Sequence, residues 1–206
     1  MLARLSHTRL LRYAGLFTWA MACLPLLYSW IGQWRDPLPD DAVAHVMPWQ
    51  GWACYLAFGA GYWWLTRGLG QRRQALGYIL LAITTLAAIG LGFYSETGLG
   101  SVLLMVAACV LPWLLPLQLG VVWLVGAQLA VVPVFMLGLK FPLFEALMQS
   151  MLYAGISGFV FITSLVALQQ SEAREEQRRL NAELRATRAL LTESARVNER
   201  TRISRE

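Results

Sequence analysis

The stretch GFVFITSLVALQQSEAREEQRRLNAELR, residues 158–185, decides the fold of this chain. Its first part is mostly apolar, and from Ser171 onward acidic and basic residues occur at nearly every second position. After Gly158 the chain contains neither glycine nor proline, the two residues that most often interrupt a helix. The sequence therefore predicts one helix that begins in an apolar region and continues into a polar one.

Apolar residues dominate everything that precedes this polar segment. Of the 206 residues, 57% are hydrophobic and 14% are charged, whereas an ordinary soluble domain carries about 25% charged residues. Apart from Glu145, the few charges before residue 170 lie near the N-terminus or in short connections between apolar runs. This distribution predicts an all-α membrane protein in which residues 1–168 form a transmembrane bundle.

The apolar runs supply about six membrane-spanning helices. Each needs about 20 apolar residues, and prolines and charges separate most of the runs. The block from Leu99 to Leu139 is too long for one helix, and Pro112 and Pro116 divide it into two. Five spans remain the alternative, if this block forms one span and a re-entrant segment. The expected spans are residues 10–31, 48–66, 75–94, 99–115, 117–139 and 142–168.

Basic residues predict how the bundle lies in the membrane. Cytoplasmic loops carry an excess of arginine and lysine, and six spans place both arginine clusters and the charged tail on that side. The net charge of +5 is therefore distributed as membrane anchors, which argues against direct nucleic-acid binding. The clusters are Arg4, Arg9 and Arg12 before the first span and Arg67, Arg72 and Arg73 after the second.

Residues 169–198 carry the pattern of a coiled-coil helix. Their apolar positions follow the four-three-four spacing of a coiled-coil seam, and the helix is otherwise too polar to be stable without a partner. A second copy of the chain carries the same apolar stripe and can pair with it, so we expect a parallel homodimer. The seam comprises Leu180, Leu184, Thr187 and Leu191, and continues to the polar Ser194 and Asn198.

The last eight residues, ERTRISRE, resemble the start of the dimerisation and phosphoacceptor helix in sensor histidine kinases of the DesK/NarX/LiaS type. In that family the pattern Glu-Arg-x-Arg-Ile-Ala-Arg-Glu is followed at once by Leu-His-Asp. Ser204 stands where alanine is commonest, and the phosphoacceptor motif would come directly after Glu206. The matching residues are Glu199, Arg200, Arg202, Ile203, Arg205 and Glu206.

The resemblance implies the membrane sensor and signal-transmission region of a two-component sensor histidine kinase in the bacterial inner (plasma) membrane. Residues 199–206 then begin a dimerisation helix that is cut just before its histidine. In the full-length kinase, ATP and Mg²⁺ bound by a separate domain serve autophosphorylation on histidine, and the phosphate passes to a cognate response regulator. Residues 1–206 are expected to hold no catalytic residue or cofactor of their own and to be inactive alone.

Two other functions fit an apolar bundle. A similar helix could feed a different output domain, such as a nucleotide cyclase. A small transporter is the less favoured interpretation. Transporters place ionisable residues or broken helices at the bilayer midplane, whereas Glu145 lies near one end of its expected span.

Three ionisable residues are candidates for sensing. Glu145 lies one turn inside the last expected span, five residues after Lys140. Charged groups within the membrane are costly, so this pair is either a polar switch or an interfacial anchor. His45 lies beside Asp40 and Asp41 in the first outer loop and titrates near neutrality. It is either a pH or cation sensor or an ordinary solvated loop residue.

Small and amide side chains indicate close contacts between helices. Ser150, Ala154 and Gly158 follow one another at four-residue spacing, which permits close approach of a second helix. That helix belongs either to the same subunit or to a dimer partner. Gln118 and Gln128 are expected to bond across helices as structural links.

Overall fold

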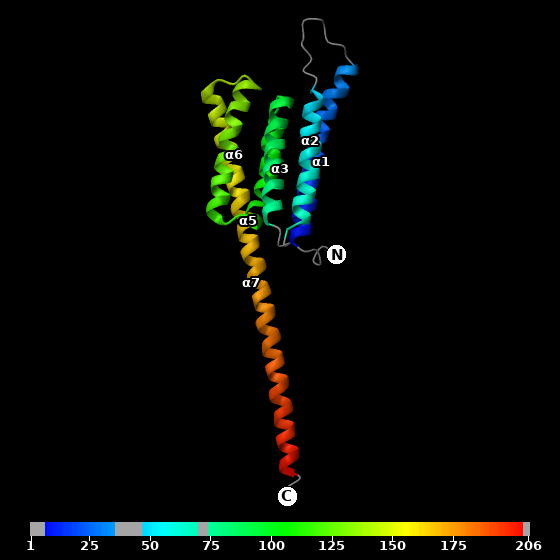
Figure 1. Ribbon diagram of the computed structural model, residues 1–206, viewed down its shortest axis with the longest axis vertical. Coiled ribbons are helices and arrows are strands. Elements are labelled where there is room, and N and C mark those ends of the chain that lie inside the picture. Colours follow the sequence, from blue (N-terminus) through cyan, green and yellow to red (C-terminus); the bar gives the residue numbers. More distant parts are fainter. Residues whose placement is uncertain (1–6, 36–46, 70–73, 204–206) are drawn as a thin grey trace. The chain divides into compact units, whose positions relative to one another are not determined.

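The computed structural model describes residues 7–35, 47–69 and 74–203, and every regular element in these ranges is an α-helix. The prediction of an all-α chain is confirmed. The helices, shown in Figure 1, are α1 (His7–Arg35), α2 (Trp49–Arg67), α3 (Gln74–Ser95), α4 (Leu99–Ala108), α5 (Leu111–Leu114), α6 (Leu117–Leu137) and α7 (Leu143–Ile203).

The chain divides into two compact units, Met1–Leu165 and Val166–Glu206. The first unit contains α1 to α6 and the beginning of α7, and the second contains the rest of α7. The long uninterrupted helix expected at the end of the chain is therefore present, from Leu143 to Ile203.

By length and composition, four helices in the described part of the chain can cross a membrane, which is compatible with a multi-pass membrane protein. The sequence pattern predicts six. The difference lies in α4, which has only 10 residues, and in α2, whose 19 residues include many tryptophans, tyrosines and glycines of modest hydropathy. The four segments are Arg9–Tyr28, Ala75–Ser95, Leu117–Leu137 and Leu143–Ser194.

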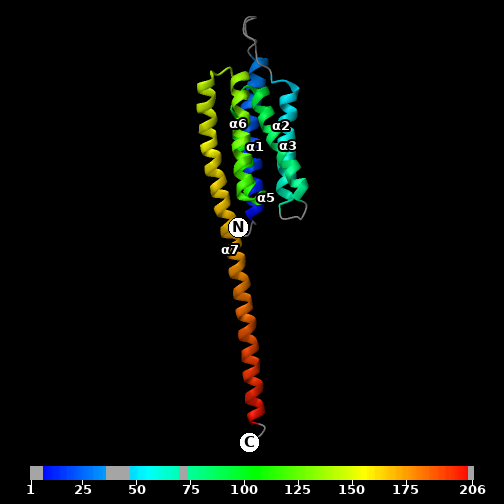
Figure 2. The same cartoon turned by 60° about the vertical axis from the view of Figure 1, so that its left-hand side comes forward.

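Within the first unit, successive long helices run in opposite directions, as Figures 1 and 2 show. Helix α3 is central, because it contacts α2, α4, α5 and α6, whereas α1 packs on α2 and α4. The turns after α3 and after α6 lie at the same end of this unit. Each contains one non-glycine residue with positive φ, Glu96 at 49° and Lys140 at 56°.

Prolines determine where several helices begin and end. Pro48 and Pro116 are the N-cap residues of α2 and α6. Pro112 lies four residues after Ala108, the last residue of α4. Proline lacks an N–H and its ring clashes with the carbonyl four residues earlier, which kinks or breaks a helix. Pro25 and Pro133 lie inside the continuous helices α1 and α6, whereas the helix breaks before Pro112. The expected span 99–115 is consequently two helices, α4 and α5.

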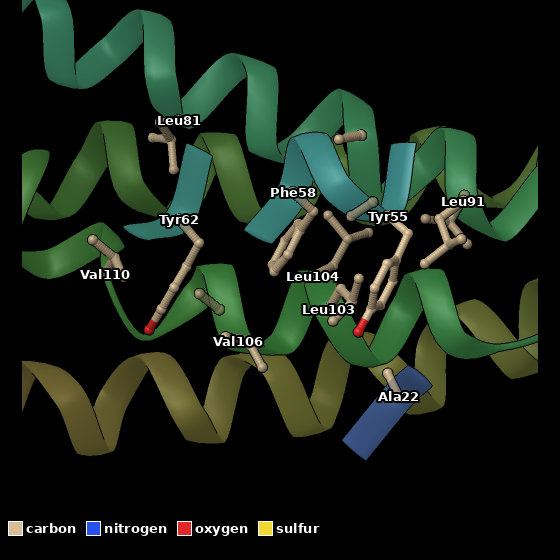
Figure 3. Packing of buried hydrophobic residues seen from close by; sticks show 14 of the residues in the cluster. Ala22, Tyr55, Phe58, Tyr62, Leu81, Leu91, Leu103, Leu104, Val106 and Val110 are labelled. Carbon is tan, nitrogen blue, oxygen red and sulfur yellow. The ribbon is translucent and has the colours of Figure 1, made fainter. Parts of the chain in front are cut away.

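The core of the first unit is built on an aromatic face of α2. Tyr55, Phe58 and Tyr62 follow the three-four spacing of one helix face and are almost completely buried. Figure 3 shows these three side chains lying among leucines from α3 and α4, such as Leu81 and Leu103. These large side chains fill the space between α2, α3 and α4 with close-packed contacts.

Helices α1 and α2 interlock through aromatic rings and glycines. The Trp19 ring lies at Gly59, and the Tyr62 ring lies at Gly15, so that a methyl group at either glycine would collide with a ring. The Trp19 indole N–H donates to the carbonyl of Tyr55 (2.9 Å), and the Tyr55 hydroxyl donates to the carbonyl of Trp19 (2.8 Å). Their rings stack with centroids 4.8 Å apart.

Helices α3 and α4 approach even more closely, at Gly92 and Gly100. A Cβ atom built on Gly100 would lie 2.8 Å from the Cα atom of Gly92 and would also meet the carbonyl oxygen of Ala88. Backbone therefore lies against backbone at this crossing, as in other close crossings of small residues in membrane helices.

Candidate functional site

The part of α7 that lies in the first unit is attached by small side chains. Its buried residues are Ala146, three serines and Phe161. The serines, Ser150, Ser157 and Ser164, are seven residues apart, or about two helical turns, and therefore share a face. The bulky side chains of the same segment are exposed instead; they include Phe144, Met148, Met151, Leu152, Phe159 and Ile162.

Each of the three serines forms a hydrogen bond with a neighbouring helix or turn. Ser150 donates to the backbone carbonyl of Gln128 (2.9 Å), and the Gln128 side-chain amide donates to the Ser157 hydroxyl (3.0 Å). Ser164 donates to the carbonyl of Cys109, in the break between α4 and α5. These contacts form what we call the serine face of α7: Ser150, Ser157 and Ser164.

The carbonyl of Cys109 is available because the helix is interrupted there. In a continuous helix the N–H of Trp113 would bond to this oxygen, but here it bonds to the carbonyl of Val110 (3.1 Å). Pro112, which ends α4, therefore creates the acceptor that holds Ser164. A proline and a serine that are far apart in sequence thus form one connection.

The expected bond from Gln128 across helices is confirmed by its contact with Ser157. Gln118, in contrast, is exposed on the first turn of α6. A further link joins α6 to α3, where the Trp123 indole N–H donates to the Thr85 hydroxyl (3.2 Å).

Within one copy of the chain, the stripe of Ser150, Ala154 and Gly158 does not pack as one face against a neighbouring helix. Ser150 is buried against α6, while Ala154 and Gly158 are only half-buried. A Cβ atom added at Gly155 or Gly158 would meet no atom within 4 Å. The packing face is turned toward Ser157 and Ser164 instead, because these hydroxyls find partners and Ala154 cannot.

The proposed sensing residues are not brought together. Glu145 and Lys140 are both exposed, and within the described ranges no ion pair joins them. Glu145 lies in the first turn of α7, where a carboxylate interacts favourably with the helix dipole. His45 lies outside the described residues.

Arg12 has a defined structural role that composition alone does not indicate. Its guanidinium donates to the carbonyl of Thr66 (3.0 Å), in the last turn of α2, and lies 5.4 Å from the ring centroid of Trp63. It thereby caps α2 and forms a cation–π contact. The N-terminal part of α1 and the C-terminal part of α2 are fixed together by this residue.

In the second unit, the apolar positions of the expected seam are exposed. Leu180, Leu184 and Leu191 are about half exposed or more, at 49%, 56% and 63%. Thr187 and Ser194 donate to carbonyls of their own helix. The seam therefore presents an exposed apolar stripe. A coiled coil requires such a stripe on each of its helices.

The family-motif residues are placed only in part. Glu199, Arg200, Arg202 and Ile203 lie within α7, as does Asn198 of the seam, but their side chains are outside the description. Arg205 and Glu206 lie beyond the described residues.

Among the described residues, no group of three or more His, Cys, Asp and Glu side chains is arranged to hold a metal ion. The serine face and its partners instead form a polar connection between helices inside an apolar bundle. Comparisons with protein-family models, with curated proteins and with solved structures found no match for this chain.

Proposed function

We propose that this chain is the input and signal-transmission region of a sensor histidine kinase of a two-component system, acting as a homodimer in the bacterial inner membrane. The observation that carries the proposal is α7. One helix contains a serine face packed into an apolar bundle, an exposed leucine stripe and the start of the ERTRISRE motif. A helix that transmits movement from a membrane bundle to a kinase core needs these three segments in this order.

In this proposal the bundle crosses the membrane six times, with both termini in the cytoplasm. Helix α2 is about 28 Å long, close to the thickness of the hydrocarbon layer of about 30 Å. It has no charged residue before Arg67. Helices α4 and α5 form a shorter span whose residues are largely covered by neighbouring helices. The resulting orientation places Arg67 and the polar part of α7 in the cytoplasm, as the positive-inside rule favours.

The serine face supports a signal that travels as a small displacement of α7. Large interdigitated side chains resist sliding and rotation, because displacement breaks their close packing. The large side chains by which this segment packs on the bundle are the buried Phe161 and the partly buried Tyr153, which stacks on Phe135. Its other fully buried residues are small, so a shift of α7 disturbs fewer large contacts. We therefore infer that a stimulus acting within or beside the bilayer shifts α7 against α6.

The coiled coil then converts this displacement into one of two states. Ser194 and Asn198 occupy seam positions where leucine would fix a single register. A polar seam allows two registers to differ by about a few kcal/mol, which a switch needs. In the full-length kinase the favoured register sets ATP- and Mg²⁺-dependent autophosphorylation and hence phosphotransfer to the response regulator.

The experiment joins residues 1–206 in frame to the catalytic core of a DesK/NarX/LiaS-type kinase, beginning at Leu-His-Asp. Autophosphorylation is measured with radiolabelled ATP in membrane vesicles. Replacement of Ser194 and Asn198 by leucine should hold the activity in one state, so that it no longer varies with membrane composition. The matched control replaces Thr192 and Arg196 by leucine; these positions have the same four-residue spacing but lie off the seam, so the control should remain responsive.

Insertions after Ser171 test the same proposal through helix phase. Seven added residues restore the seam register, whereas two rotate the seam by about 200°, to the opposite side of the helix. Activity should therefore be retained with seven and altered with two. Equal activity for all insertion lengths would show that α7 does not transmit the signal.

A further inference from the structure

A small cavity lies where α3, α6 and α7 meet inside the first unit. Its volume is about 10 Å³, and leucines and alanines form most of its wall. Four polar side chains also line it: Thr85 of α3, Trp123 and Gln128 of α6, and Ser157 of α7. A cavity with this mixture of walls differs from the dry voids of apolar cores.

Gln128 brings an unpaired polar atom to this cavity. The residue is only 5% exposed, and its Nε2 atom donates to Ser157. Its Oε1 atom is buried and accepts no hydrogen bond from any residue in the described ranges. Buried amide oxygens in folded proteins are bonded to protein or to ordered water, because leaving one unpaired costs free energy.

Either orientation of the Gln128 amide plane leaves one polar atom without a protein partner. Ser157 can accept from the amide nitrogen or donate to the amide oxygen, so one end of the amide is satisfied in both cases. The other end then needs a partner that can donate to an oxygen or accept from a nitrogen. Water does both.

Thr85 and Ser157 have further hydrogen-bonding capacity that a water molecule in the cavity could use. Thr85 donates its hydroxyl to the carbonyl of Leu81 (2.8 Å) and accepts from Trp123, and an oxygen with two lone pairs can accept a second bond. Ser157 accepts from Gln128 and keeps its own proton to donate. A buried water needs about 10–15 Å³ and two to four polar partners. The cavity provides both.

We propose that this cavity is a binding site for one resident water molecule, held by Gln128, Ser157 and Thr85. The water joins α7 to α6 and α3 at the centre of the serine face. The site belongs to the bundle alone and is independent of the output that α7 serves.

The test is water-to-amide magnetisation transfer by NMR on the full chain in lipid nanodiscs, with ¹⁵N-labelled glutamine. The Gln128 side-chain amide should show a cross-peak at the water frequency with the sign of a slowly tumbling, long-lived water. Gln128→Met identifies the resonance by its loss. Exposed Gln118 is the matched internal control and should show only the signal of rapidly exchanging molecules.

Two variants separate a bound water from other sources of that signal. Ala107→Val fills the cavity while keeping the amide, and the cross-peak should disappear; Gly126→Ala adds its methyl group in open space and should change nothing.

Absence of the cross-peak in the unaltered chain or its survival in Ala107→Val would each overturn the proposal. If Gln128→Met does not fold, the selective change in Ala107→Val assigns the resonance instead. None of these outcomes bears on kinase activity, so they leave the proposed function to its own tests.

Discussion

The contact between Gly92 and Gly100 shows how much a single residue can control in this bundle. Two helices meet there with no side chain between them, and even a methyl group has no space. Dispersion forces between closely apposed backbones stabilise membrane helix pairs that the hydrophobic effect cannot drive together.

Gly100→Ala should therefore destabilise the first unit. The added methyl group must push α4 away from α3, and overpacking of this kind costs about 1–3 kcal/mol. Unfolding by SDS in mixed micelles, followed by tryptophan fluorescence, should show a lower midpoint. Gly126→Ala is the matched control, because its methyl group meets no atom within 4 Å. Equal midpoints for both variants would contradict the close contact.

For a hydrogen bond between helices, the sequence can predict one of the two partners but not the other. The sequence marks Gln128 as a polar group that must find a partner across helices, but it does not mark Ser157 as that partner. Serine in an apolar helix gives no distinctive signal, since its hydroxyl often bonds to its own helix, as Ser171 does to Leu168 (2.7 Å). The acceptor for Ser164 is the carbonyl of Cys109, which lies in the break between α4 and α5 and does not receive the helical bond from Trp113.

At the scale of elements, the apolar runs and prolines locate the helices well. The expected spans 48–66 and 75–94 correspond to Trp49–Arg67 and Gln74–Ser95, and Leu117 begins α6 as expected. The division of span 99–115 into α4 and α5 does not follow from the apolar pattern. That pattern assigns Pro112 to the turn between two spans, whereas its steric effect falls four residues earlier, within the span.

The orientation of α7 about its axis could not be predicted from the pattern of small residues. Four-residue spacing favours Ser150, Ala154 and Gly158, but the serine face follows seven-residue spacing. Apolar membrane helices lack the polar–apolar contrast that orients a helix in water. Specific hydrogen bonds therefore decide which side of α7 faces the bundle.

The serine face makes an element-scale prediction about α7. Ser157→Leu should lower the SDS unfolding midpoint strongly, because a large side chain cannot fit a fully buried site, at a cost of about 1–3 kcal/mol. Ser157→Ala should cost less, about 0.6 kcal/mol, since it removes one interhelical hydrogen bond. Gly155→Leu, two residues away at an exposed position, is the control and should not lower the midpoint. A reversed order of these effects would refute the assigned face.

At the scale of the whole molecule, composition alone indicates two parts, and the boundary between units at Leu165 lies close to the expected end of the bundle at residue 168. Pairing of the second part is a property of two chains, so neither one sequence nor one copy decides it. The proposed output depends on the same kind of long-range order, because it combines the serine face, the exposed leucine stripe and the start of the ERTRISRE motif in one helix.

The six-span topology predicts which connections reach each side of the membrane. Cys23, Cys54 and Cys109 are first replaced by alanine, and single cysteines are then introduced one at a time. Glu96→Cys and Lys140→Cys should react with a membrane-impermeant maleimide in intact spheroplasts. Gly68→Cys and Thr192→Cys should react only after permeabilisation. Labelling of positions 140 and 192 from the same side would exclude a final span between them.

The acceptors of the serine face have a consequence for reading homologous sequences. Ser150 and Ser164 donate to main-chain oxygens at positions 128 and 109, which every amino acid possesses. Mutation at the accepting position leaves the bond intact, so these contacts exert no pressure for compensating change. Methods that infer proximity from correlated substitutions should consequently miss these two contacts, whereas the bond between the side chains of Gln128 and Ser157 stays detectable.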